Sequence, residues 1–310
     1  MSKQNLVLFH GNCPDGVTAA WAAWKVLGDD AEYVPMFHPI RSLPDCTDRN
    51  VYLLDFSCAR DIMIQADACA RSFLVLDHHE GQEKEIKGLP FVVFDKSRAG
   101  AGLAWDYFHP EMPRPAMVNL IEDRDIRKFL YVETDPILHL FDDSGFHQRF
   151  DASSTFTQMS EFSALIDADS ITFGGYDKTD KRIINLEGLM IPGLERHNKF
   201  MALCMNLSAN ATPMNLFGQP GLAVNCPVPF EDAIATILAT RCNGVGVVYH
   251  HSPTNPKNVK LSLRSNEIDV MSIAQKLGGN GHRHASGCQI PFTDLFAMFS
   301  LGEPNTAAYA

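Results

Sequence analysis

The sequence predicts an α/β protein with a mostly parallel sheet flanked by helices. Apolar runs at residues 5–10, 51–56 and 72–76 have the length of buried strands, and helix-like segments separate them. Strands that alternate with helices in this way are typical of βαβ units and of a parallel sheet. Hydrophobic residues make up 45% and charged residues 20% of the 310 positions, so the chain can bury sizeable cores.

The elements follow one another in a regular order through the first third of the chain. Strands are expected at residues 5–10, 33–37, 51–56, 72–76 and 91–95, with helices at 17–27, 59–70 and 99–108. The glycine-containing turn at 11–16 joins the first strand to the first helix. From about residue 114 to 190 the pattern is mostly helical, with a loop expected at 151–155.

Strand-like patterns return in the last third of the chain. Strands are expected at residues 221–225, 244–249 and 259–264, followed by a helix at 270–277, a glycine-rich loop and a strand at 287–292. The change of pattern places a boundary inside the helical stretch, between about residues 175 and 205. We therefore expect a helical linker that joins a larger domain, residues 1–190, to a smaller α/β domain, residues 191–310.

Composition and charge argue against several classes of protein. The formal net charge of −11 opposes tight binding to long nucleic acid, which needs a cationic surface. No apolar run is long enough to span a membrane, and the N-terminus lacks the pattern of a signal peptide, so we expect a cytoplasmic protein. The eight cysteines form no CxxC pair, which favours reduced thiols over disulfides or a zinc knuckle.

Groups that can bind metal follow several of the expected strands. Asp77, His78 and His79 come directly after the apolar run 73–76. Ligands of open α/β sheets bind at the carboxyl edge of the strands, and imidazole with carboxylate suits divalent manganese, zinc or iron. This triplet therefore indicates metal-assisted chemistry.

Other strand ends carry groups of the same kind. His10 ends the first strand and precedes Asp15, and Asp55 ends the third strand. A further carboxylate, Asp123 or Asp125, follows the apolar run that ends at residue 121. Each residue alone has an ordinary explanation as a helix cap, a turn residue or a structural histidine. Parallel strands bring these ends to one edge, so we expect them to share a metal site.

Five sequence blocks, taken in order, resemble the DHH phosphoesterase superfamily, in the branch with a DHH-associated C-terminal domain. Four are N-terminal: residues 10–16 (HGNCPDG), 54–55 (LD), 77–79 (DHH) and 122–123 (ED). The fifth, residues 278–287 (GGNGHRHASG), is similar to the glycine-histidine loop of that C-terminal domain. The resemblance spans nearly the whole chain, and identifies residues 1–190 as the catalytic domain and 191–310 as the substrate-binding domain.

The resemblance implies a centre with two divalent cations, manganese before others. Asp55 would bridge the cations, His78 and Asp123 would complete one position with Asp15, and His10 would help to bind the other. Two such cations polarise a phosphoryl group and make water a nucleophile at neutral pH, so no protein nucleophile is needed.

Two more residues of the triplet have implied catalytic roles. His79 would contact phosphate rather than metal, and Asp77 would orient the neighbouring imidazoles.

The first block departs from the family pattern, which usually holds two aspartates separated by one residue. Only Asp15 is present here. If Gly16 sets the alignment, Cys13 replaces the first aspartate; if the preceding proline sets it, Val17 replaces the second. We favour the first alignment, in which Asn12, Cys13 or extra waters could substitute for the missing carboxylate at the position nearest the first histidine.

The C-terminal block predicts a substrate site. Its glycines would let backbone amides approach an anion, and its basic side chains would add donors. Arg264 matches a family position that contacts phosphate or base. The expected substrate-binding residues are His79, Arg264, Gly278, Gly279, Gly281, His282, Arg283 and His284.

The function implied is a manganese-dependent phosphodiesterase acting on cyclic dinucleotides, linear dinucleotides or short oligonucleotides. The expected partner is therefore a small nucleotide, with no long duplex and no membrane, and a homodimer is possible because family members often form dimers. Two alternatives remain: a phosphomonoesterase of nucleoside 3′,5′-bisphosphates, and a nucleotide-binding sensor with weakened catalysis.

Overall fold

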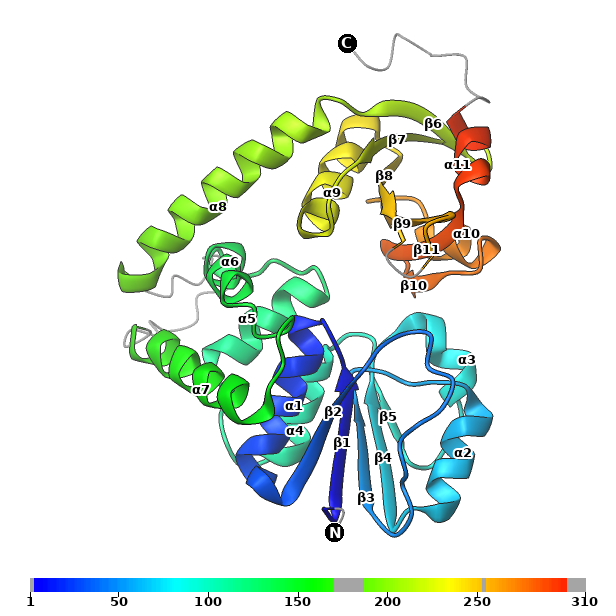
Figure 1. Cartoon of the computed structure of the whole chain (residues 1–310). Coiled ribbons are helices and arrows are strands. Elements are labelled where there is room, and N and C mark those ends of the chain that lie inside the picture. Colours follow the sequence, from blue (N-terminus) through cyan, green and yellow to red (C-terminus); the bar gives the residue numbers. More distant parts are fainter. Residues whose placement is uncertain (1–2, 170–186, 253–254, 300–310) are drawn as a thin grey trace. The chain divides into compact units, whose positions relative to one another are not determined.

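The chain folds into two compact units, Met1–His197 and Asn198–Ala310, so the boundary falls within helix α8 (Glu187–Ser208). Figure 1 shows both units in a computed structural model. The structure describes residues 3–169, 187–252 and 255–299.

A five-stranded parallel sheet forms the centre of the first unit. Its order is β2-β1-β3-β4-β5, and every neighbouring pair is parallel. The strands are β1 (Asn5–His10), β2 (Ala31–Met36), β3 (Asn50–Leu54), β4 (Ser72–Asp77) and β5 (Val92–Phe94). The predicted α/β class and the parallel sheet are confirmed, with strand ends shifted by one or two residues.

Helices cover both faces of this sheet because the buried side chains alternate along each strand. Val7 and Phe9 pack in one core, and Leu6 and Leu8 in another. In Figure 1 α1 and α4 lie on one side of the sheet, and α2 and α3 on the other. These helices are α1 (Pro14–Leu27), α2 (Arg60–Cys69), α3 (Glu83–Ile86) and α4 (Gly100–Phe108).

Three helices follow in the stretch that the sequence predicts to be helical. They are α5 (Ala116–Asp125), α6 (Thr134–Ser144) and α7 (Ala152–Asp169). The loop expected at 151–155 is wrong for all but its first residue. Oδ1 of Asp151 accepts hydrogen bonds from the amides of Ser153 and Ser154, so this aspartate caps a helix that begins at Ala152.

The second unit contains a six-stranded mixed sheet in the order β10-β11-β9-β8-β7-β6. Only the pair β7 and β8 is parallel. Its elements are β6 (Thr212–Leu216), β7 (Gln219–Asn225), α9 (Glu231–Cys242), β8 (Val245–His251), β9 (Asn258–Arg264), α10 (Val270–Lys276), β10 (Asn280–His282), β11 (Ala285–Pro291) and α11 (Phe292–Phe299). The sequence analysis missed β6, β10, α9 and α11.

Three short 3-10 helices, η1 (Gly28–Asp30), η2 (Glu80–Gln82) and η3 (Val228–Phe230), complete the elements of the described residues. Among the described helices, none combines the length and the apolar composition needed to cross a bilayer. The eight cysteines all lie in the described part of the chain, and all are free thiols.

A pair of histidines joins α6 to the first half of α8. Nδ1 of His139 lies 3.3 Å from Nδ1 of His197, and the two rings stack with centroids 5.1 Å apart. In this contact one nitrogen must donate and the other must accept. Burial, followed by the charge of His197, lowers the pKa of His139 from 6.5 to about 4. The folded chain therefore favours a neutral imidazole at this position.

Replacing this imidazole by a ring that does not titrate should remove one source of acid sensitivity. Between pH 6.5 and about 4 the unfolded chain binds a proton at His139 that the folded chain does not, so the native protein loses stability as the pH falls. The His139→Phe variant lacks this loss. Urea unfolding at several pH values gives the free energy of unfolding of both proteins. The value for the variant minus that for the native chain should increase as the pH falls from 6.5 to about 4. A difference that does not change with pH would contradict the assignment.

Candidate metal centre

Asp55 lies at the end of β3, where the sheet presents its carboxyl edge. Its backbone adopts a left-handed conformation with φ of 61°, and its amide donates to the carbonyl oxygen of Leu76. Its side chain is 1% exposed. Residues other than glycine seldom adopt this conformation, although aspartate does so more readily than most, and such positions cluster at functional sites.

His78, which follows β4, collects three carboxylates around one ring nitrogen. Its Nε2 lies 3.1 Å from Oδ1 of Asp55, 3.5 Å from Oδ2 of Asp15 and 3.5 Å from Oδ2 of Asp125. The contact with Asp55 is a hydrogen bond. Three carboxyl groups therefore surround a single imidazole nitrogen in this group.

A second group of ligand atoms lies on the other side of Asp55. Nδ1 of His10 is 3.4 Å from Oδ2 of Asp55, and Sγ of Cys13 lies within 4.8 Å of both residues' ligand atoms. Asp15, His78 and Asp125 form a comparable group with the same spacing. Asp55 thus directs one carboxylate oxygen toward each group.

Several ligand atoms in the two groups have no hydrogen-bond partner among the described residues. They are Nδ1 of His10, Oδ2 of Asp55 and Oδ2 of Asp125, and all three atoms are buried. Leaving a buried polar atom unpaired costs about 1–3 kcal/mol. Oxygen and imidazole nitrogen are the donors that divalent transition cations bind. The residues present therefore fit a pair of divalent cations.

The N-terminus of α4 holds Asp15 in place. The amides of Gly100 and Ala101 donate to Oδ2 and Oδ1 of Asp15 at 2.6 and 2.7 Å. A helix N-terminus favours a carboxylate because its amides and its dipole are both directed at the anion. At Gly100 a Cβ atom would lie 2.5 Å from Cβ of Asp55 and 2.9 Å from Oδ2 of Asp15, so the close approach requires glycine.

The acids in the cluster influence one another's protonation. Burial, then the charges of Asp55 and Asp125, raises the pKa of Asp15 well above its usual value. Burial likewise raises the pKa of Asp125. Burial would also raise the pKa of Asp55, but the imidazoles of His10 and His78 outweigh it and lower that pKa well below the usual value. Without a cation, Asp15 and Asp125 therefore hold their protons more tightly than free carboxyl groups do, and cation binding would compete with those protons.

Asp77 positions the two histidines that follow it. Its Oδ1 accepts hydrogen bonds from Nδ1 of His79 at 2.7 Å and from the amide of His78 at 2.8 Å, and its Oδ2 accepts from Ser57 at 2.6 Å. Burial would raise the pKa of Asp77, but the charge and hydrogen bond of His79 outweigh it and hold that pKa to about 2. In return the Asp77 charge outweighs the effect of burial on His79 and raises the pKa of that imidazole.

One predicted ligand is replaced by its neighbour. The carboxylate of Asp123 accepts hydrogen bonds from the amides of Leu130 and Tyr131 and from the hydroxyl of Thr134, so it fixes the connection between α5 and α6. Asp125, the other candidate at this block, lies beside His78 instead. The structure thus places Asp125 rather than the predicted Asp123 beside His78.

The glycine-rich block of the second unit is more ordered than a loop. Residues 280–282 form β10, which pairs with β11 in a hairpin. The amides of Gly278 and Gly279 donate to the carbonyl oxygens of Gln275 and Ala274, at the end of α10. These two amides terminate the helix, which corrects the expectation that they approach an anion. Gly281, with φ of 145°, lies in the edge strand of the hairpin.

The basic side chains of this block lie around the hairpin. Arg283 and His284 occupy its exposed turn, and Nδ1 of His284 contacts the carbonyl oxygen of Ser265 at 3.0 Å. His282 ends β10 and is partly buried. Nε of Arg264 donates to Oδ1 of Asp232 at 2.7 Å, an ion pair within the unit. Their contact with substrate remains a prediction.

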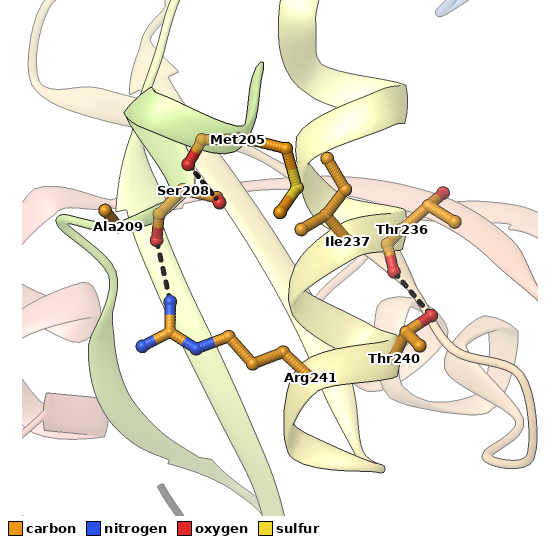
Figure 2. A pocket seen from close by; sticks show the side chains of 7 residues that line it. All are labelled: Met205, Ser208, Ala209, Thr236, Ile237, Thr240 and Arg241. Atoms are coloured by element: carbon orange, nitrogen blue, oxygen red, sulfur yellow. Dashed lines mark hydrogen bonds between the residues drawn. The ribbon is translucent and has the colours of Figure 1, made fainter. Parts of the chain in front are cut away.

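A cavity of about 610 Å³ in the second unit is lined by none of the predicted site residues (Figure 2). The end of α8 and one face of α9 line it, with Met205, Ser208, Ala209, Thr236, Ile237, Thr240 and Arg241. Its polar groups bond to the wall itself, as Arg241 does to the carbonyl oxygen of Ser208. None of the lining residues is a carboxylate or an imidazole, so the cavity offers little to a metal or a reacting phosphate.

The sequence analysis overlooked several residues that shape the centre. Ser57 and the amides of Gly100 and Ala101 hold Asp77 and Asp15, and the ring of His38 lies 5.5 Å from that of His10. His38 follows β2, so it could have been found by the strand-end rule that identified His10. The amides of α4 could not have been found in this way, because a backbone amide is not distinguished by residue type.

Comparisons with known proteins test the resemblance. No family model matches the chain. A solved structure described as the DHH domain of a member of the s1p family of ribosomal proteins superposes with a TM-score of 0.56, at 14% identity over 96% of this chain and 86% of that one.

The chain shares the fold of this DHH domain.

This finding confirms the family resemblance at the level of the fold. The pGpG-specific phosphodiesterase PggH of Vibrio cholerae is similar at a TM-score of 0.48, with 17% identity over 95% of this chain and 96% of that one. An uncharacterised protein of Acanthamoeba polyphaga mimivirus is 25% identical over 304 residues, 91% of this chain. The match spans 66% of the length of the viral protein.

Filling the space at the N-terminus of α4 should damage the centre. In Gly100→Ala the new methyl group would displace Asp55 or Asp15. We expect affinity for divalent cations, measured by isothermal titration calorimetry, to fall by at least about tenfold, as when other supporting groups of metal ligands are removed. Gly145→Ala is the matched control, because its φ of 71° makes alanine unfavourable while no atom lies within 4 Å of the new Cβ. Equal losses of affinity in both variants would contradict the proposed geometry.

Substituting each of the two neighbouring aspartates should separate a ligand from a structural residue. Asp125→Asn should weaken cation binding with little change in stability. Asp123→Asn should lower the free energy of unfolding by about 1–3 kcal/mol, since it weakens the hydrogen bonds of a buried carboxylate, one of them from the buried hydroxyl of Thr134. Calorimetric titration and urea unfolding of both variants would decide between them. The reverse pattern would restore Asp123 as the ligand.

Proposed function

We propose that this chain is a metal-dependent phosphoesterase that hydrolyses phosphodiester bonds in small nucleotides. The observation that supports this most is the placement of Asp55 between two groups of ligand atoms, with one oxygen directed toward each. A carboxylate shared in this way is what a two-cation centre requires. Manganese is the first candidate for the position formed by Asp15, His78 and Asp125, because its ligands are carboxylate and imidazole.

Two divalent cations bound at the centre would polarise the phosphoryl group and supply a water nucleophile at neutral pH. The protein's contribution is to keep the ligands in place. The amides of α4 fix Asp15, and the left-handed backbone of Asp55 directs its carboxylate between the groups. The proposed mechanism therefore uses water as the nucleophile and needs no nucleophilic side chain.

His79 has a different part in the proposed reaction. Asp77 holds its Nδ1 and raises its pKa, so this imidazole more readily carries a proton and a positive charge. A protonated imidazole can donate to a phosphate oxygen and stabilise the charge that develops there. Asp77 acts through this ring as a positioning residue.

The substrate class follows from charge as well as from the centre. The net charge of −11 disfavours long nucleic acids, whereas bound cations can reverse the field locally for a small anion. Cyclic dinucleotides, linear dinucleotides and short oligonucleotides are therefore the proposed substrates. PggH, whose description names pGpG as its substrate, is compatible with this class but does not decide it.

A product-resolved assay would test the proposal. The purified chain should convert at least one cyclic or linear dinucleotide to smaller nucleotides in manganese, and excess chelator should abolish the activity. Asp55→Asn and His78→Ala should each lose on the order of a hundredfold or more, because each removes a ligand of the centre. Asp67→Asn, an exposed carboxylate on α2, is the control and should retain full activity.

Three outcomes would count against the proposal. Release of inorganic phosphate from a nucleoside 3′,5′-bisphosphate, with no cleavage of dinucleotides, would favour the monoesterase. Tight nucleotide binding without turnover would favour a sensor. Full activity in both centre variants would show that the reaction takes place elsewhere.

A further inference from the structure

The side chain of Cys13 is available at the edge of the centre. Cys13 is the N-cap residue of α1, yet its side chain makes no capping hydrogen bond. Its Sγ lies with ligand atoms of His10 and Asp55, all within 4.8 Å of one another. The thiol therefore belongs by position to the second group of ligands, with His10 and Asp55.

The neighbours of this thiol also point to a missing ligand. Nδ1 of His10 and Oδ2 of Asp55 are buried and have no hydrogen-bond partner among the described residues, although they lie only 3.4 Å apart. Asp55 is 1% exposed, so water has little access to its carboxylate. Buried polar atoms are nearly always paired, and a cation between these two atoms would satisfy both.

The structure also decides between the two alignments of the first block. Val17 is 1% exposed and packs in the hydrophobic core with Phe9 and Trp21, so its position cannot supply a ligand to the centre. Cys13 therefore occupies the position where the DHH pattern has its first aspartate.

We propose that Cys13 is a metal ligand and that, with His10 and Asp55, it forms a soft cation position beside the harder one at Asp15, His78 and Asp125. Thiolate ligands favour zinc, iron or cobalt over manganese and magnesium. On binding, the thiol loses its proton to solvent and the sulfur donates an electron pair to the cation, with no change of oxidation state. The inference rests on the proposed two-cation centre and adds that its positions differ in metal preference.

Cobalt(II) reports directly on a sulfur ligand, because a cobalt–thiolate bond gives a charge-transfer absorption in the near ultraviolet. The metal-free protein, kept reduced and anaerobic, is titrated with cobalt(II) while absorbance and bound metal are measured. We expect two cations per native chain and the thiolate band. Cys13→Ser should lose the band, and Cys69→Ser, which removes an exposed thiol of the same unit, should keep it.

Competition between zinc and manganese tests the proposed preference. Cys13→Asp should retain two cations, because it supplies a carboxylate in place of the thiol. Its zinc-to-manganese affinity ratio should fall by at least about tenfold relative to the native chain. Thermal unfolding of the metal-free variants identifies any that fail to fold. The cobalt titration of Cys13→Ser and the metal competition of Cys13→Asp test the role of Cys13 independently.

The outcomes separate this inference from the proposed function. If the native chain binds no divalent cation, the proposed two-cation centre fails. If it binds two cations but shows no thiolate band, or if Cys13→Ser keeps the band, the centre stands and the role of Cys13 is overturned. An unchanged metal preference in Cys13→Asp would also overturn it.

Discussion

The crowding of three carboxyl groups at the carboxyl edge of the parallel sheet is the constraint on which the centre depends. Asp15, Asp55 and Asp125 each bring an oxygen within 3.5 Å of Nε2 of His78. Two like charges about 4 Å apart repel by roughly 4 kcal/mol at the dielectric typical of a protein. The fold keeps these groups close together because other buried groups hold Asp15 and Asp55 in place.

Those groups come from distant parts of the chain. The N-terminus of α4 binds Asp15, and the left-handed backbone after β3 orients Asp55. Asp77 holds the two histidines that follow it by hydrogen bonds, and Ser57 donates to Asp77. Each support uses backbone or side-chain hydrogen bonds that are buried and therefore difficult to exchange with water. The rigidity of this arrangement suits a site that must keep its ligand atoms in place while substrates come and go.

Most of the fold could be predicted from the sequence because its strands are short apolar runs with clear ends. The same feature located His10, Asp55 and His78, since a strand end is a local signal. The choice between Asp123 and Asp125 was different. Two residues are separated by about 200° around a helix, so they lie on opposite sides, and only the packing of α5 shows which side faces the cluster.

The glycine-rich block shows a second limit of sequence reasoning. Its composition indicated backbone freedom correctly, as the φ values of Gly278 and Gly281 show. Composition does not reveal where amides donate, and two of them end α10. The hydrogen bonds from Gly100 and Ala101 to Asp15 could not be predicted for a related reason. Every residue except proline has a backbone amide, and these two lie 85 and 86 positions further along the chain.

That separation in sequence has a consequence for the stability of the folded chain. The centre is complete only when β1, β3, β4 and α4 have all assembled, so anything that binds there recognises the folded state alone. A ligand present at a hundred times its dissociation constant would stabilise such a fold by about 2.7 kcal/mol. The same stabilisation would apply to variants weakened by substitutions far from the bound ion.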